Sequence, residues 1–276
     1  NYDKLLNPIA EINTSVEALL DGAFGPTMGD QREGLKRVHS NAWGLHTLLM
    51  DVVTNLGIEN IARRDYLERK FGEHVQPIVE NAQTLLDGVD GPLNPEQVVA
   101  VEFICDTGHL LKRHVETLCF YSQLVHNKVK RPMVPIAIQD IVEPLELPVT
   151  TKPIELELLL SENLPIARGD AHLLKRSIEA LVSNAINFTD EGTIKVTGTA
   201  DQKFVSVQVQ DSGIGIKRDN QRRIFEPFYQ VNPQRHHGIG LGLTLAQKMV
   251  ALQGGKIAVK SSVNQGTTFT LTIPLA

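Results

Sequence analysis

Apolar residues recur at helical spacing through most of the first 130 residues. Within residues 29–52 they are separated by three, four and seven positions, which places their side chains on one face of an α-helix. These apolar positions are Leu35, Val38, Leu45, Leu49 and Val52. A stretch rich in Gly and Pro, LLDGAFGP at residues 19–26, precedes them. The pattern predicts a helix, a tight turn and a longer helix, which together form an αα-hairpin.

The same pattern occurs a second time, 66 positions further along the chain. The turn sequence returns as LLDGVDGP at residues 85–92, and Gln31 falls on Gln97. The five apolar positions fall on Val101, Ile104, Leu111, Val115 and Leu118. We therefore expect two hairpins, residues 1–59 and 66–130. Because a lone two-helix unit buries only one apolar stripe, we expect them to pack on each other as an intramolecular, pseudo-dimeric four-helix bundle in a monomer. The alternative is a homodimer in which each hairpin pairs with a second chain.

From about Met133 the hydrophobic pattern changes. Short β-like stretches at 154–160, 193–197 and 204–209 alternate with helical segments, and residues 170–188 have one apolar helical face. This alternation predicts an α/β sandwich over residues 133–276, with helices on one face of a mixed sheet. The fold class is thus multidomain, with helical hairpins followed by an α/β domain.

The composition of the chain excludes several classes of function. The net charge of −5 over 276 residues argues against a dedicated nucleic-acid binder, which carries a basic face. The two cysteines, Cys105 and Cys119, lack metal-ligand spacing and are expected to be buried free thiols in a reducing cytosol. No apolar run reaches the roughly 18 residues that a membrane helix needs. The chain begins without Met, so we expect a cytoplasmic fragment whose sensory part lies upstream, where a membrane tether stays possible.

Two glycine clusters carry the most specific chemistry. DSGIGI at 211–216 is followed by GIGLGL at 238–243, with RIFEPFYQ at 223–230 between them and NAINFT at 184–189 upstream. Glycine-rich turns let backbone N–H groups approach phosphates closely. In this order the four elements resemble the sensor histidine kinases of two-component systems, within the GHKL (Bergerat-fold) ATPase superfamily.

The resemblance implies ATP and Mg²⁺ as cofactors. Asn184 matches the magnesium-coordinating asparagine of the family, and Asp211 matches the carboxylate that accepts a hydrogen bond from the adenine amino group. Gly213 and Gly215 would let the backbone wrap the base. Thr267 falls in the family's closing segment and is a further nucleotide-binding candidate.

The same resemblance implies an ATP lid. Phe225 and Phe228 match the aromatic box beside this lid, although core packing is an equally good interpretation. The lid would span residues 231–237, with Arg235, His236 and His237 as candidates for phosphate contact. After it, three glycines would open a helix near Leu241, whose N-terminal amides suit an anion. They are Gly238, Gly240 and Gly242.

The chain departs from the family where phosphoryl transfer is carried out. Counting from Pro8, the phosphoacceptor histidine position holds Asp3, and its equivalent in the second hairpin is Arg69. A guanidinium is always protonated and cannot be a nucleophile. His74, in the local sequence EHVQP, is the nearest surrogate acceptor, although its register matches the proline of the motif.

The predicted nucleotide helix departs from the family as well. Ala180 replaces a polar residue associated with catalysis, and Asn187 replaces a common lysine that would face the phosphates. The adjacent Glu179 points about 100° away around the helix, so it is a poor substitute for that polar residue.

Three functions follow from these patterns. The first is a degenerate histidine kinase that binds Mg-ATP and signals through conformation or partner docking. The second is an active kinase that phosphorylates His74, another histidine or a histidine on a partner. The third is a GHKL-type ATPase or interaction scaffold. The resemblance implies a response regulator or another histidine kinase as partner.

Overall fold

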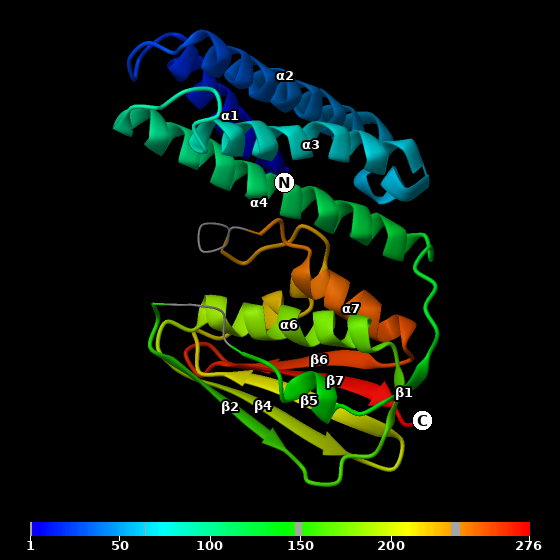
Figure 1. The fold of residues 1–276 in the computed structure, drawn as a ribbon. Helices are drawn as coiled ribbons and strands as arrows, with labels where there is room; N and C mark the ends of the chain where they lie inside the picture. The colour runs from blue at the N-terminus through cyan, green and yellow to red at the C-terminus, as the bar shows by residue number, and fades with distance from the viewer. Residues whose placement is uncertain (1, 64, 147–150, 233–237) are drawn as a thin grey trace. The chain divides into compact units, whose positions relative to one another are not determined.

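The computed structural model describes residues 2–63, 65–146, 151–232 and 238–276. The chain divides into two compact units, Asn1–Lys128 and Val129–Ala276. Each unit is described by itself below, with the labels of Figure 1.

The first unit is a bundle of four long helices (Figure 1). These are α1 (Asp3–Leu20), α2 (Gly29–Asp51), α3 (Asp65–Leu86) and α4 (Pro95–Val125). Each helix packs against two others, because α1 contacts α2 and α4, while α3 contacts the same two helices. After α2 the chain continues through a π-helical turn, η1 (Val52–Leu56), and a 3₁₀-helix, η2 (Ile58–Arg63), which the hydrophobic pattern did not predict.

The bundle core repeats with the same 66-residue offset as the sequence. Leu5, Ile9 and Ile12 on α1 are buried, and so are the residues that the offset pairs with them on α3. Those partners are Phe71, Val75 and Ile78. On α2, the adjoining η1 and α4, all ten apolar positions of the repeated stripe are also buried. The expected helical hairpins and their packing on each other within one chain are therefore present.

Two buried glutamines join the hairpins reciprocally. The Gln31 amide donates to the carbonyl oxygens of Gly91 and Pro92, at 3.2 and 3.0 Å. The Gln97 amide donates to the carbonyl oxygens of Gly25 and Pro26, at 3.4 and 3.1 Å. Each residue in the first set lies 66 positions from its counterpart in the second, so the bundle has an internal pseudo-twofold relation.

These glutamines give a stability prediction. Replacing Gln31 or Gln97 with alanine removes its two part-buried hydrogen bonds to backbone carbonyls, and also the bond that its Oε1 accepts from the backbone N–H three residues earlier. Each substitution should lower the free energy of unfolding by about 1–3 kcal/mol, and the two losses should be similar. Urea denaturation measures both. The matched control is Gln83→Ala on exposed α3 surface, which should cost about 0.5 kcal/mol or less; a similar loss there would contradict the prediction.

The second unit contains a mixed sheet with the strand order β2-β4-β5-β7-β6. Its strands are β2 (Ile154–Leu160), β4 (Gly192–Ala200), β5 (Phe204–Asp211), β6 (Lys256–Ser261) and β7 (Thr267–Pro274). Strand β2 pairs parallel with β4, and the remaining neighbours are antiparallel. A smaller antiparallel pair, β1 (Val134–Ile136) with β3 (Ala167–Gly169), lies beside it and was not predicted.

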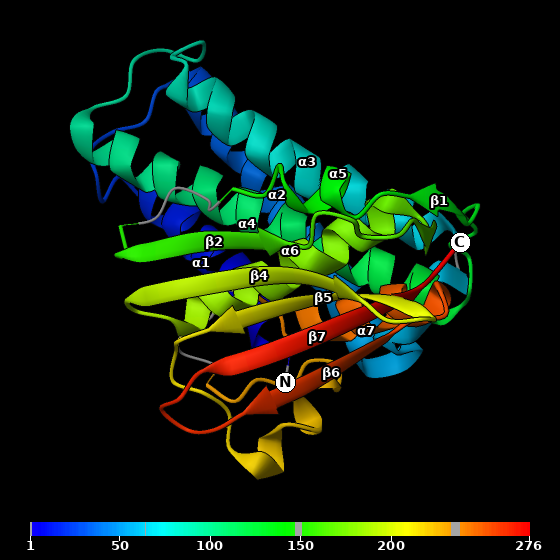
Figure 2. The same ribbon diagram turned by 90° about the horizontal axis from the view of Figure 1, so that it is seen from below.

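One face of the sheet carries the helices (Figures 1 and 2). They are α6 (Ala171–Phe188) and α7 (Gly242–Leu252), with the short α5 (Gln139–Val142) contributing to the same core. On β5, Val205, Val207 and Val209 alternate with polar residues and are buried under these helices. Asp170 caps α6 by accepting a hydrogen bond from the Leu173 N–H at 2.8 Å, which fixes where the helix begins. The predicted α/β sandwich is confirmed.

Both cysteines are free. Cys105 is buried and Cys119 is half-buried, and burial raises the pKa of the Cys119 thiol to about 12. The thiol therefore stays protonated at neutral pH and is a poor nucleophile. Among the described helices, none is long and apolar enough to span a bilayer.

Candidate functional site

Asp211 is the last residue of β5, and one oxygen of its buried carboxyl group accepts hydrogen bonds. Its Oδ1 accepts hydrogen bonds from the backbone N–H groups of Gly213, at 2.9 Å, and Thr267, at 3.1 Å. Within the described ranges, Oδ2 receives no hydrogen bond. Burial raises the pKa of this carboxyl, and the two N–H groups oppose that shift. The site thus holds a fixed acceptor in a largely dry position.

The first glycine cluster forms a loop between α6 and the β6–β7 turn. The Ile214 N–H donates to the carbonyl of Phe188 at the end of α6, and the Ile214 carbonyl accepts from Asn264 N–H. Gly215 has a φ of +67°, and a Cβ built there would collide with the carbonyl oxygen of Ser262. Glycine is therefore required at this position by both conformation and space.

Gly215→Ala should consequently disrupt the loop, whereas Gly242→Ala should be tolerated. Gly242 is the first residue of α7, and a Cβ there would meet nothing within 4 Å. We expect Gly215→Ala to cost about 1–3 kcal/mol of stability, and Gly242→Ala to change it by about 0.5 kcal/mol or less. Thermal denaturation of both variants checks this. Equal losses would show that the loop is not held as described.

One face of α6 borders this loop. Asn184 is half-buried, and Ala180 and Asn187 lie one helical turn from it on the same side. Glu179 is exposed and is paired with Lys175 at 3.8 Å, so it does not occupy the position of Ala180. The face therefore presents two side-chain amides, Asn184 and Asn187, with an alanine at position 180.

Lys152 closes the C-terminus of α6, a role that the sequence did not indicate. Its Nζ donates to the carbonyls of Ile186, Asn187 and Thr189, at 2.9, 3.3 and 2.9 Å. A cation at this end also favours the helix dipole. The ammonium group fixes the last turn of the helix that carries Asn184. No local signal in the sequence indicates this contact, because Lys152 lies 34 to 37 residues from the carbonyls to which it donates.

The two aromatic candidates lie in different environments. Phe225 packs edge-on against the buried Phe269, with ring centroids 6.3 Å apart, so it belongs to the core cluster. Phe228 is half-buried, has a φ of +63°, and donates its N–H to the carbonyl of Gly240 at 3.0 Å. Strained, non-glycine backbone of this kind is enriched at functional sites.

The second glycine cluster leads into α7 near the predicted position. Gly240, with φ +77°, lies against the Phe228 backbone, and Gly238 accepts a hydrogen bond from Gln230 Nε2 at 2.8 Å. The proposed lid residues Arg235, His236 and His237 lie outside the described residues. Thr267 is buried next to Asp211, and its hydroxyl is 2.9 Å from the Ser261 hydroxyl.

The candidate phosphoacceptor positions lie in the helical unit. Asp3 is exposed at the start of α1. Arg69 is exposed and donates to Glu73, which also accepts from Lys70, both at 2.7 Å. His74 lies against α2: its Nδ1 is 3.4 Å from Asn41 Oδ1, and a Cβ at Gly44 would collide with its ring. None of these three positions presents an open imidazole.

Residues 169–276 match the family described as "Histidine kinase-, DNA gyrase B-, and HSP90-like ATPase". Among curated proteins, the chain is 28% identical to the circadian input-output histidine kinase CikA of Synechococcus elongatus, over 82% of this chain and 32% of that protein. It is 32% identical to the sensor histidine kinase RcsC of Salmonella typhimurium, over 69% of this chain and 21% of that protein. Residues 169–276 belong to this ATPase family, and the relatives of the chain are sensor histidine kinases.

Two further comparisons agree with this membership. The autoinducer 2 sensor kinase/phosphatase LuxQ of Vibrio harveyi is 31% identical over 87% of the chain and 31% of its own length. The crystal structure of full-length ShkA in complex with AMPPNP shares the fold, with a TM-score of 0.68, 24% identity, and coverage of 78% of this chain and 46% of that one. This chain spans less than a third of the length of these curated relatives.

Proposed function

We propose that the C-terminal unit binds Mg-ATP and that the protein is a degenerate histidine kinase, signalling through nucleotide-dependent conformation and partner docking. The observation that carries the nucleotide assignment is the Asp211 carboxyl. Its Oδ1 is held by two backbone N–H groups, and Oδ2 stays available to accept from an exocyclic amino group such as that of adenine. Gly213 and Gly215 keep the adjacent backbone free of side chains.

The residues present fit a magnesium ion bound together with phosphates. Mg²⁺ takes oxygen ligands and keeps several waters, so one side-chain oxygen is a usual protein contribution. Asn184 would supply it, on a helix whose last turn is fixed by Lys152. When bound, the ion would neutralise phosphate charge and orient the phosphates; this chain's residues would position the nucleotide around it.

The degenerate part of the proposal rests on the acceptor positions. Asp3 and Arg69 replace histidine, and the ring of His74 packs against α2 instead of standing clear of the bundle. Ala180 also leaves the nucleotide helix without the polar residue that the family associates with catalysis. A protein with these changes would hold ATP more readily than it would transfer its γ-phosphoryl group to itself.

We propose that the intramolecular bundle makes the protein a monomer. The reciprocal Gln31 and Gln97 contacts satisfy within one chain what a dimer would satisfy between two. We propose a response regulator or another histidine kinase as the partner, because the relatives are histidine kinases. Light scattering of residues 1–276 tests the monomer, and a mass near 30.5 kDa is expected.

Calorimetric titration with ATP, with and without Mg²⁺, tests the nucleotide site. We expect binding with Mg²⁺ and weaker binding without it. Asn184→Ala should remove most of this magnesium dependence while leaving metal-free binding nearly unchanged. The control is Asn127→Ala in the other unit, which should alter neither titration. Absence of binding at millimolar ATP would overturn the proposal and make the domain a structural remnant.

A further inference from the structure

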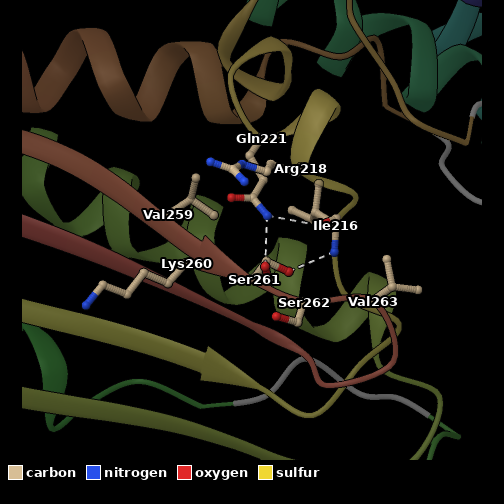
Figure 3. A pocket seen from close by; sticks show the side chains of 8 residues that line it. All are labelled: Ile216, Arg218, Gln221, Val259, Lys260, Ser261, Ser262 and Val263. Carbon is tan, nitrogen blue, oxygen red and sulfur yellow. Dashed lines mark hydrogen bonds between the residues drawn. The ribbon is translucent and has the colours of Figure 1, made fainter.

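A shallow pocket of about 560 Å³ lies at the end of edge strand β6, beside the first glycine loop (Figure 3). Ile216, Val259 and Val263 give it an apolar lining, and Val263 is 49% exposed. Arg218 and Lys260 are the charged residues that line it. The pocket thus combines exposed apolar surface with two cations at an open sheet edge.

Hydrogen bonds fix the residues on one side of the pocket. Gln221 Nε2 donates to the carbonyls of Ile216, at 3.0 Å, and Ser261, at 2.8 Å, while the Ser261 hydroxyl accepts from the Ile216 N–H at 2.7 Å (Figure 3). These bonds join η3 (Arg218–Asn220) and the glycine loop to the end of β6. The surface is therefore preformed, which lowers the entropy lost on binding.

The outer edge of β6 offers backbone hydrogen bonds. The Thr267 N–H donates to Asp211 on the β5 side, so Ser261 and its partner Thr267 form a non-hydrogen-bonded pair. By alternation, Lys256, Ala258 and Lys260 bond to β7, and the N–H and C=O groups of Ile257 and Val259 point away from it. In the part of the chain that the structure describes, nothing bonds to these outward groups.

The charge around this edge is positive, although the whole chain carries −5. Lys256 and Lys260 project from β6, and Lys217, Arg218 and Arg222 lie along the adjoining segment, all of them exposed. Asp219 is the acidic residue within that segment. No described acidic group forms an ion pair with any of these five cations. The cluster is therefore complementary to carboxylates.

We propose that β6 docks an extended, acidic peptide segment of a partner protein, which adds to the sheet as an extra strand. The partner's backbone would bond to the outward groups of Ile257 and Val259. Its apolar side chains would enter the pocket, and its acidic side chains would meet Lys260 and Arg218. This inference is independent of the proposed nucleotide function, because none of these residues is assigned to the nucleotide.

Two terminally blocked, fluorescently labelled octapeptides test it: one alternating Val and Glu, the other alternating Val and Lys. Fluorescence anisotropy with residues 1–276 should show the Glu peptide binding at least tenfold more tightly than the Lys peptide, with the difference shrinking in 0.5 M salt. Hydrogen exchange should slow at the amides of Ile257 and Val259 when the Glu peptide is present. Equal affinity for both peptides, or unchanged exchange at these amides, would overturn the proposal.

Two variants sharpen the test. Val259→Pro removes an outward N–H that β7 does not use, and proline is tolerated on edge strands, so binding should fall at least tenfold with the fold retained. The double substitution Arg218→Glu and Lys260→Glu should reverse the preference toward the Lys peptide. Lys175→Glu on α6 is the charge control and should leave both affinities unchanged. If the double variant still preferred the Glu peptide, this docking surface would be excluded.

Discussion

Replacing Asp211 with asparagine should weaken ATP binding about 10- to 100-fold, the loss expected for a hydrogen bond made by a charged group. Asparagine keeps the shape of the side chain and one carbonyl oxygen, which can still accept from the N–H groups of Gly213 and Thr267. Its amide nitrogen would then stand where Oδ2 stands, and it would present a donor to the donor of adenine. The loop should stay in place while recognition of the base fails.

The same substitution should raise the stability of the protein at neutral pH. Burial raises the folded-state pKa of Asp211 above its unfolded value, so the folded state holds the proton more tightly. Stability from this group is present at pH values below the unfolded pKa and is lost as pH rises through the folded pKa. At pH 7 the wild-type carboxylate therefore carries a cost that asparagine avoids.

Thermal denaturation at pH 4 and pH 7, together with calorimetry, separates these effects. The gain from Asp211→Asn should be larger at pH 7 than at pH 4. Asp201 gives a control of opposite sign, because the N–H groups of Lys203 and Phe204 lower the pKa of its exposed carboxyl. Asp201→Asn should therefore not stabilise the protein at pH 7, and it should leave ATP binding intact. Loss of stability in Asp211→Asn would indicate a structural carboxylate.

Much of this fold was predictable because its signals are local. The helices of the bundle follow from apolar spacing and from two Gly-Pro turns, and the 66-residue repeat relates them. The start of α6 at a capping Asp170 and the start of α7 within the second glycine cluster are also local features. The candidate site residues Asp211 and Gly215 could be named because the two glycine clusters, in their order along the chain, resemble those of a known family.

Other features could not be predicted because they depend on distant segments. Lys152 reaches carbonyls at the far end of α6, and Gln221 bonds to Ser261 40 residues away. Polar side chains at such positions look like ordinary surface residues until the fold brings their partners close. The edge position of β6 has the same origin, because strand order β2-β4-β5-β7-β6 is set by the tertiary fold and not by sequence order.

The duplication of the hairpin within one chain allows the residues of its two halves to differ. In a bundle made by one chain, the two acceptor positions are free to differ, and the positions that we assign to them hold an acid and a cation, Asp3 and Arg69. A symmetric pair of chains would present the same residue twice. The pseudo-twofold relation preserved by Gln31 and Gln97 therefore maintains packing, while the surface chemistry of the two halves has diverged.

Incubation of the wild-type protein with γ-labelled ATP and Mg²⁺ should leave no acid-labile, base-stable phosphate on the chain. Phosphohistidine has this stability pattern, and the positions that we assign to the acceptor hold Asp3 and Arg69. His74→Ala should make no difference, because the His74 ring is packed against α2 at Gly44. Label that disappears in His74→Ala would instead make His74 the acceptor and contradict the degenerate assignment.

Two substitutions that restore the family's residue types can then show why the protein does not phosphorylate itself. Asp3→His returns an imidazole to an exposed position on α1, and a neutral imidazole is a competent nucleophile near pH 7. Ala180→Glu returns a polar group to the α6 face that carries Asn184. We expect label in the double variant and little in either single variant, because nucleophile and catalytic group are both missing from the wild type. Label in Asp3→His alone would show that the nucleotide helix is still competent, and that only the acceptor has been lost.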